Sequence, residues 1–268
     1  MKDKRVLVIS SEVVPYLPEN ELSTTSFETA KMVHSKGGQT RIFMPRYGLI
    51  NERRHQLHEV IRLSGMNLVI NDMDMPLIIK VASIPKERMQ VYFIDNEEYF
   101  KRKALFSDED NHLFKDNDER AIFFAKGVVE TVKKLNWAPD IIHVHGWLAS
   151  LIPLYIKEYY KDDALFVDSK IVTSLYNTGF EGELNKELPN KIKFDNIMDS
   201  KIESITTPNH TNLLKIAIEN SDAVIKASDN LSKELDDFLT ASEKPVLDHV
   251  SMEELGNMYT EFYLNEVL

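Results

Sequence analysis

Short apolar, β-branched runs alternate along this chain with longer stretches whose apolar residues recur at helical spacing. The first run, residues 5–10, predicts a strand, and the helical pattern that follows closes at residues 30–36. Gly37 and Gly38 end that helix before a second predicted strand at residues 39–45. The order strand, helix, strand is typical of a parallel sheet with right-handed crossovers.

The alternation breaks between residues 46 and 89. Three short strand-like runs there, separated by glycine and by a polar cluster, predict an antiparallel insertion at one edge of the sheet. These runs are residues 59–63, 67–70 and 76–82. Residues 90–95 then return as a core strand, and we expect the polar residues 98–118 to be an exposed surface excursion.

The second half of the chain restores the alternation of strands and helices. Helices are expected at residues 118–137, 148–160, 211–219 and 231–239, strands at 139–145, 169–175 and 223–227, and a polar, irregular stretch at 179–207. Residues 252–268 form the last predicted helix, with its apolar residues on one face. We therefore predict a single α/β domain over residues 1–268. It has a Rossmann-like, mainly parallel twisted sheet, helices on both faces, and the last helix packing back on it.

Composition narrows the class of protein. The chain has 268 residues, 43% of them hydrophobic, which is enough for a core without covalent staples. It has no cysteine, which excludes disulfides and thiolate chemistry and favours a reducing compartment. A net charge of −11 and the lack of a dense basic run argue against a nucleic-acid or anionic-membrane surface. With no signal-peptide pattern and no run of about 20 apolar residues, we expect a cytoplasmic protein that contacts no membrane.

The carboxyl ends of the predicted parallel strands are where ligands bind in open α/β sheets. His143 and His145 lie two residues apart on one strand and therefore face the same side. No third ligand is placed nearby in the sequence, so we expect no metal, a structural His143 and a pocket-lining His145. Trp147 follows directly, and it either stacks on a sugar ring or anchors the next helix.

Three segments in fixed order carry a resemblance to a known family. They read SEVVPY at residues 11–16 with MPRY at 44–47, VYFIDNEEYF at 91–100 with DNDERAIFF at 116–124, and WAPDIIHVHGW at 137–147. Together they resemble the bacterial glycogen and plant starch synthases that use ADP-glucose. That family has the GT-B fold, two Rossmann-like domains with the active site between them. The resemblance covers only the N-terminal, acceptor-side domain, and it implies that the donor-binding domain has no counterpart here.

The loop after the first strand departs from the family pattern. In the family it reads Lys-Thr-Gly-Gly, where the lysine meets phosphate and the glycines let backbone amides approach the nucleotide. Here Pro18 stands at the lysine, and Asn20 and Glu21 replace the two glycines. Because Glu12 is also close in sequence, we expect a diphosphate to meet negative charge at this loop.

The family's catalytic positions are substituted as well. Its His-Asp-Trp-His motif reads His-Gly-Trp-Leu, with Gly146 at the carboxylate and Leu148 at the second histidine. The histidine that the family uses in the transition state aligns with Tyr176, whose hydroxyl is a poor base at neutral pH. The resemblance therefore leaves no catalytic residue intact.

Several candidate ligand contacts remain on this scaffold. The family's asparagine survives as Asn177, an acceptor-site tyrosine falls at Phe106, and a family lysine falls at Lys215. Glu12 either touches a glucan hydroxyl or caps nearby amides. The full set of candidate contacts is Glu12, Asn20, Phe106, His145, Trp147, Tyr176, Asn177 and Lys215.

These observations lead to three hypotheses. The first is a glycogen synthase-like domain without ADP-glucose transfer and without a cofactor, retained to bind a glucan or small sugar or to regulate. The second is a working half of a glucosyltransferase that another chain completes. The third is an interaction scaffold, in which a second copy or a partner chain covers the exposed face of the former cleft.

Overall fold

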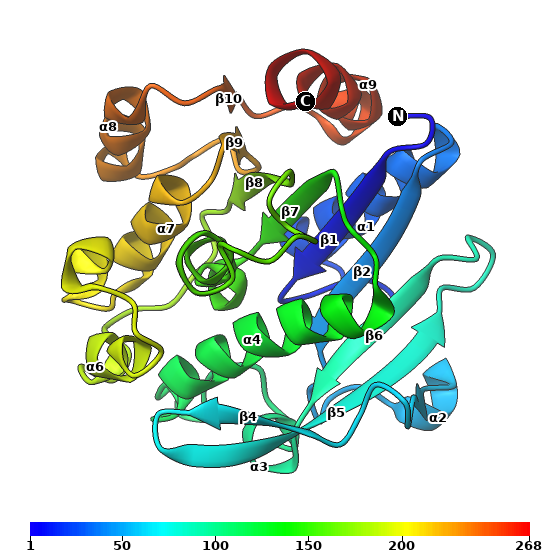
Figure 1. The fold of residues 1–268 in the computed structure, drawn as a ribbon. Helices are drawn as coiled ribbons and strands as arrows, with labels where there is room; N and C mark the ends of the chain where they lie inside the picture. The colour runs from blue at the N-terminus through cyan, green and yellow to red at the C-terminus, as the bar shows by residue number, and fades with distance from the viewer.

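Figure 1 shows the fold of the protein, a computed structural model that describes residues 1–268. Ten strands form a sheet in the order β10-β9-β8-β7-β1-β2-β6-β5-β3, and β4 pairs with β5 off this path. The strands from β10 to β6 in this order are parallel, and β3, β4 and β5 make antiparallel pairs at one edge. The prediction of a mainly parallel α/β sheet with an antiparallel edge insertion is confirmed.

The strands and helices have the following bounds. The strands are β1 (Arg5–Ser10), β2 (Gln39–Pro45), β3 (His58–Glu59), β4 (Met66–Ile70), β5 (Met73–Ser83), β6 (Gln90–Asp95), β7 (Ile141–His145), β8 (Lys170–Leu175), β9 (Ala223–Lys226) and β10 (Val246–Leu247). The helices are α1 (Glu21–Ser35), α2 (Glu52–His55), α3 (Glu97–Phe100), α4 (Asn117–Leu135), α5 (Ile152–Leu154), α6 (Leu188–Lys193), α7 (His210–Glu219), α8 (Lys233–Ser242) and α9 (Met252–Phe262). Short 3-10 turns lie at Trp147–Ala149, Asp199–Lys201 and Glu203–Ile205, and π turns at Tyr155–Tyr159 and Tyr263–Val267.

Several predicted elements differ from the structure. The run at residues 59–63 forms only the end of the two-residue strand β3, because the chain turns where the Leu63 N–H donates to the Val60 carbonyl at 2.9 Å. Residues 148–160 are not one regular helix but a 3-10 turn, the short α5 and a π turn. The irregular stretch contains α6, and β10 follows β9 at the end of the sheet.

The expected surface excursion at residues 98–118 was wrong, because aromatic side chains draw its beginning into the core. Tyr99 and Phe100 on α3 are buried and pack against Phe123 of α4, with ring centroids 5.3 and 6.2 Å away. Asp118 at the start of α4 is also buried, where its carboxylate accepts from the Lys191 ammonium at 2.6 Å. The longest exposed run of this segment is residues 108–112, and Glu98, Lys101, Lys103 and Lys115 are exposed individually.

The helices cover both faces of the sheet, with α4 on one face and α1 on the other (Figure 1). The last helix, α9, lies beside α1, where the Thr260 hydroxyl donates to the Met32 sulfur at 3.1 Å. The π turn after α9 reaches the sheet itself, since the Tyr263 hydroxyl lies 2.5 Å from His143 Nδ1. Most buried apolar side chains form one continuous cluster around the sheet. No helix is both long enough and apolar enough to cross a membrane.

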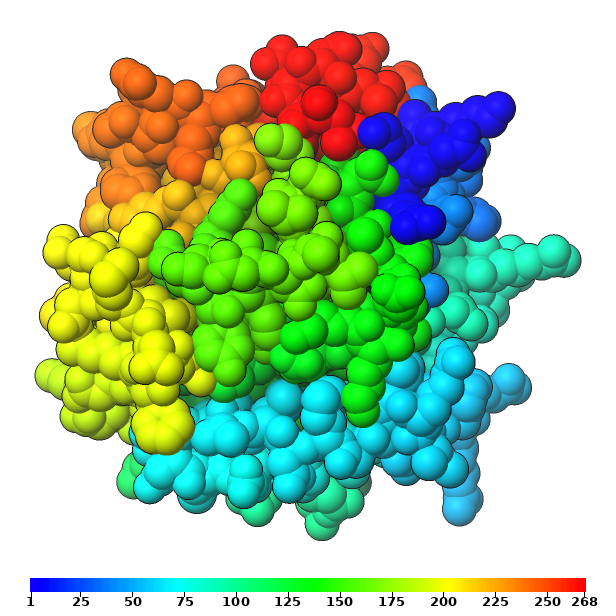
Figure 2. All heavy atoms as spheres, in the orientation of Figure 1, coloured from blue at the N-terminus to red at the C-terminus, as the bar shows by residue number.

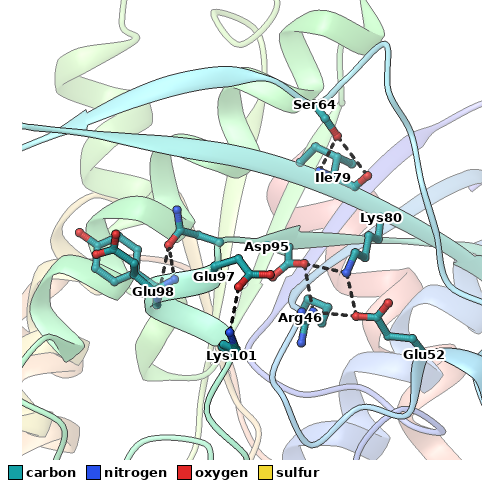
Figure 3. A network of polar contacts seen from close by, with 11 residues as sticks. Arg46, Glu52, Ser64, Ile79, Lys80, Asp95, Glu97, Glu98 and Lys101 are labelled. Atoms are coloured by element: carbon teal, nitrogen blue, oxygen red, sulfur yellow. Dashed lines mark hydrogen bonds and ion pairs between the residues drawn. The ribbon is translucent and has the colours of Figure 1, made fainter.

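A network of one buried and three partly buried charges joins the edge insertion to the parallel sheet (Figure 3). The Asp95 side chain, 4% exposed at the end of β6, lies 3.0 Å from both Arg46 Nε and Lys80 Nζ. The Glu52 carboxylate bridges the same two cations at 3.1 and 2.7 Å. The two negative charges of the carboxylates therefore balance the two positive charges of the cations. Charged groups that are removed from water need such oppositely charged partners.

Removing one member of this network should be costly. We predict that Asp95→Asn lowers the free energy of unfolding by about 2–4 kcal/mol, because it leaves two partly buried cations with one carboxylate. Adding Lys80→Met should restore part of this loss, since the remaining charges balance again. Urea denaturation of the two variants measures both effects.

The control is a pair drawn in the same figure. Lys101 and Glu97 lie 3.1 Å apart with side chains more than two thirds exposed, so Lys101→Met should change stability by less than about 1 kcal/mol. Equal losses for Asp95→Asn and Lys101→Met would contradict the account.

Candidate functional site

Four parallel strands end together at one edge of the sheet. The register places Ser10 of β1 beside His145 of β7, His145 beside Ser174 of β8, and Ser174 beside Ile225 of β9. The residues that follow these positions therefore meet at the carboxyl edge, although the sequence separates them by more than 200 residues. Most of the predicted contacts lie here, at the end of β1, β7 and β8.

The loop between β1 and α1 is closed by its own side chains. Asn20 is the N-cap of α1, where its Oδ1 accepts from the Ser23 N–H at 2.8 Å and its own N–H donates to Ser23 Oγ at 2.9 Å. The Asn20 amide also donates to a Glu12 carboxylate oxygen at 2.8 Å. Burial raises the pKa of Glu12, and this hydrogen bond opposes the shift. The helix N-terminus thus has a reciprocal cap and a carboxylate beside it.

The loop is also tied across the edge to β9. The Ser228 hydroxyl donates to the Glu21 carboxylate, and its oxygen accepts from the Asn177 backbone N–H at 3.0 Å. Asn177 itself is exposed, and Pro18 lies exposed on the loop. The hydrogen bond from Ser228 holds the Glu21 carboxylate at the first turn of α1.

Gly146 occupies a position that a side chain cannot share. Its φ is +82° and its ψ is 154°, a region that only glycine adopts readily. A Cβ at this position would lie 2.2 Å from Ser11 Oγ and 2.8 Å from Leu22 Cδ1. The Ser11 N–H donates to the His145 carbonyl at 3.1 Å, so the segments that follow β1 and β7 cannot move apart without losing this hydrogen bond. A side chain at residue 146 therefore has no room in this structure.

The two histidines of β7 are buried and neutral. His143 lies between the Tyr263 hydroxyl and Ser174 Oγ, at 2.5 and 2.7 Å. The His145 Nδ1 lies 2.7 Å from the Tyr176 hydroxyl, and its Nε2 has no hydrogen-bond partner. Burial lowers the pKa of His145 to about 3 and the pKa of His143 well below its ordinary value. Neither ring is exposed, and Leu148 after them is also fully buried.

The other side of the edge is open. A hollow of about 670 Å³ lies between residues 104–107 and 179–181, with the rings of Phe106 and Phe180 in its lining. Trp147 is 3% exposed and sits behind them, with ring centroids 4.6 Å from Phe106 and 4.8 Å from Phe180. Trp147 therefore supports the hollow and does not present its own face to a ligand.

Sequence reasoning missed two residues of this hollow. Phe180 stands at an aromatic position of the family segment around Tyr176, and that alignment was the available signal. Arg120 is wholly buried beneath the hollow, where its Nη1 donates to Asn117 Oδ1 at 2.6 Å. The Asn117 amide in turn donates to the Phe106 carbonyl at 2.8 Å. Burial lowers the pKa of Arg120 to about 10, and surrounding aromatic rings help to hold its charge.

Lys215 is not part of the hollow. It lies on α7, where its ammonium pairs with Glu234 of α8 at 2.6 Å and sits 5.5 Å from the Phe238 ring centroid. The structure therefore gathers Glu12 and Asn20 on one side of the edge and Phe106 and Trp147 on the other. It also has no group of three or more His, Asp or Glu side chains arranged to hold a metal ion.

Comparison with known proteins decides the family. Residues 5–244 match the family described as the starch synthase catalytic domain. The chain belongs to this family. It is 36% identical over 231 residues to glycogen synthase of Chlorobium luteolum, covering 85% of this chain and 46% of that protein. It is 36% identical over 236 residues to glycogen synthase of Chlorobaculum tepidum, covering 86% of this chain and 47% of that protein.

The starch synthase fold is also shared with a solved structure. The catalytic domain of Arabidopsis thaliana starch synthase IV, bound to ADP and acarbose, superposes with a TM-score of 0.75 at 16% identity, covering 94% of this chain and 52% of that one. The chain thus spans about half the length of the curated relatives it matches. It is a glycogen and starch synthase-like glycosyltransferase domain of the GT-B type.

The requirement for glycine at residue 146 can be tested directly. We predict that Gly146→Ala lowers the free energy of unfolding by about 2–4 kcal/mol, from backbone strain together with the contact on Ser11. Gly256→Ala on α9 is the matched control, because a Cβ there meets nothing nearer than 3.9 Å and alanine favours a helix. Urea denaturation measures both. A Gly146→Ala protein as stable as Gly256→Ala would contradict the prediction.

The buried histidines should make stability depend on pH. Below pH 6.5 the unfolded chain binds protons that the folded chain cannot accept at His143 and His145, so stability falls as the pH falls. Between pH 7 and pH 5 we expect each histidine to contribute a loss of about 2 kcal/mol.

Replacing one histidine isolates its share of this loss. His145→Gln should reduce the fall in stability by about 2 kcal/mol, measured by urea denaturation at both pH values. His112→Gln, at a side chain that is 79% exposed, is the control. A pH dependence identical in the His145→Gln and His112→Gln proteins would refute the assignment.

Proposed function

We propose that this domain binds an α-glucan or a smaller sugar in the hollow between residues 104–107 and 179–181. We further propose that it does not by itself transfer glucose from ADP-glucose. The observation that carries both statements is the contrast between the two sides of the carboxyl edge. One side holds an open hollow with two aromatic rings, and the other holds carboxylates beside a helix N-terminus that is already capped.

The lining of the hollow supports a sugar as the ligand. A volume of about 670 Å³ lies within the range of ligand pockets, about 300–1,000 Å³. The rings of Phe106 and Phe180 offer flat apolar faces that suit the C–H surface of a pyranose. Ser107, Asn111 and Glu181 stand beside them and offer hydrogen bonds to hydroxyl groups. Arg120 and Asn117 hold the backbone at Phe106 from below.

The closed side supports the absence of transfer. A diphosphate needs free amides or cations, and at α1 the reciprocal cap of Asn20 and Ser23 occupies two of the amides. The Glu12 carboxylate lies where an anion would come, which makes its approach unfavourable. The substituted Tyr176 is buried on His145 and is not free to contact a substrate.

A second candidate function is that of the acceptor half of an active glucosyltransferase. The 36% identity to proteins named glycogen synthase, of which this chain covers 46%, favours it. In that case the transfer would require a donor-binding half. Measurements with ADP-glucose separate the two candidates.

Glucan binding can be followed through Trp147, which packs on both rings of the hollow. Maltoheptaose should change the tryptophan fluorescence of a Trp137→Phe protein, in which Trp147 is the one remaining tryptophan. We predict that Phe180→Ala weakens maltoheptaose binding about tenfold in calorimetry, because an aromatic face is lost. Val167→Ala, an exposed apolar residue outside the hollow, should leave the affinity unchanged.

The same experiments test the lost transfer. ADP-glucose should show no measurable binding in calorimetry and no incorporation of glucose into glycogen. Replacing residues 18–21 by Lys-Thr-Gly-Gly should raise the affinity for ADP at least about tenfold, because it adds a cation and removes two carboxylates, those of Glu19 and Glu21. Turnover of ADP-glucose by the unaltered chain would end the proposal and favour the second candidate.

A further inference from the structure

A second hollow lies away from the carboxyl edge, where residues 66–69, α4 and residues 194–196 come together. Figure 2 shows the cyan, green and yellow segments that contain them meeting on one face of the molecule. There β4, α4, the π turn at Tyr155–Tyr159 and the turn after α6 meet around a space of about 430 Å³. It shares no lining residue with the hollow at Phe106 and Phe180. Its size lies within the range of pockets that hold small ligands.

Two aromatic side chains stand exposed at this second hollow. Tyr159 is 42% exposed and Phe194 is 50% exposed, and both belong to its lining. Tyr159 ends the π turn, which buries Tyr155 within the core and leaves the Tyr159 ring outside. Single π turns of this kind occur frequently at functional sites. Tyr159 and Phe194 therefore give the hollow aromatic faces that a ligand can reach.

A buried ion pair packs beneath Tyr159 and holds the turn that carries Phe194. The Lys126 ammonium, on α4, lies 2.5 Å from one oxygen of Asp195, and the other oxygen accepts from the Tyr155 hydroxyl at 2.7 Å. Both charged side chains are at most 7% exposed. Lys126 also donates to the Val69 carbonyl of β4 at 2.7 Å and lies 5.1 Å from the Tyr159 ring centroid.

This arrangement joins three elements at a single buried contact. Asp195 directly follows Phe194, so its carboxylate holds the turn that carries one ring, and Lys126 packs beneath the other ring. A buried pair rarely stabilises a fold more than apolar side chains would, so its effect here is to position groups. Rings that are held before the ligand arrives bind it with less loss of entropy.

The charges of the hollow argue against an anionic ligand. Lys126 pairs with Asp195, and Glu130 lies 3.4 Å from Lys133, so no cation is left to meet a phosphate or carboxylate. The exposed residues Asn67 and Asn196 add amide groups at the rim, which can donate to and accept from hydroxyl groups. Flat aromatic faces together with amides suit a polyhydroxylated ring.

We infer that the hollow around Tyr159 and Phe194 is a second saccharide-binding site of this domain. Two such sites on one chain bind a long polysaccharide better than a short oligosaccharide, because the second contact becomes intramolecular once the first has formed. The inference rests on residues other than those of the proposed function, so either site can fail without the other.

The experiment compares binding stoichiometry and retention of the whole chain. Isothermal calorimetry with maltoheptaose should give two sites for the unaltered protein and one for Tyr159→Ala/Phe194→Ala. In native gels that contain glycogen, the double variant should be retarded about fivefold less. Tyr159→Phe/Phe194→Tyr keeps both rings and should restore binding, which a merely structural fault would not predict. Val167→Ala, another exposed apolar site, is the control.

The outcomes separate this inference from the proposed function. If Phe180→Ala abolishes all binding, or if Tyr159→Ala/Phe194→Ala binds like the unaltered chain, the second site is refuted. If Phe180→Ala changes nothing while Tyr159→Ala/Phe194→Ala removes the binding, this inference stands and the proposed site at Phe180 fails. Circular dichroism and the thermal midpoint confirm that each variant is folded.

Discussion

The carboxyl edge of this sheet depends on one close approach between backbone segments, at the point where β1 and β7 end. The Ser11 N–H donates to the His145 carbonyl at 3.1 Å, and the chain then turns at Gly146 with a φ of +82°. Ser11 and Leu22 fill the space that a side chain at residue 146 would need. The same contact fixes the start of the loop before α1. It also fixes the position of Trp147, which lies behind the open hollow.

This contact divides the edge into two regions of different chemistry. On one side Asn20 and Ser23 cap α1 reciprocally, and Glu12 and Glu21 place carboxylates around the cap. A helix N-terminus attracts anions only while its amides are free, so a capped and acidic terminus favours none. On the other side, apolar rings and uncharged polar groups surround open space. The domain belongs to the starch synthase catalytic domain family, and carboxylates gather on one side of its carboxyl edge.

Buried charges recur in this protein as positioning devices. Asp95 joins the edge insertion to β6, Lys126 fixes the turn at Asp195, and Arg120 supports the hollow from below. Removing such groups from water is costly, so each needs close partners: carboxylates for the first two and an amide with aromatic rings for the third. Each group holds segments that are distant in sequence, which apolar packing alone would leave less strictly placed.

The sequence by itself determined the order of strands and helices, the parallel α/β class, the edge insertion and the family. The spacing of hydrophobic residues and the short motifs are local patterns among neighbouring residues, so they can be recognised in a single sequence. The resemblance also predicts departures from the family pattern at Pro18, Asn20 and Gly146, and these stay predictions. The sequence did not find the short β3, and it assigned to the surface the aromatic residues that α3 buries.

Only the tertiary structure decided which candidate residues a ligand can reach. His145, Trp147 and Tyr176 are all buried, whereas Phe180 lines an open hollow, and none of this follows from their local sequence. Accessibility depends on contacts between residues far apart in the chain, which a pattern of neighbours does not record. The hollow at Tyr159 shows the same limit, because it exists only where β4, α4 and the turn after α6 come together.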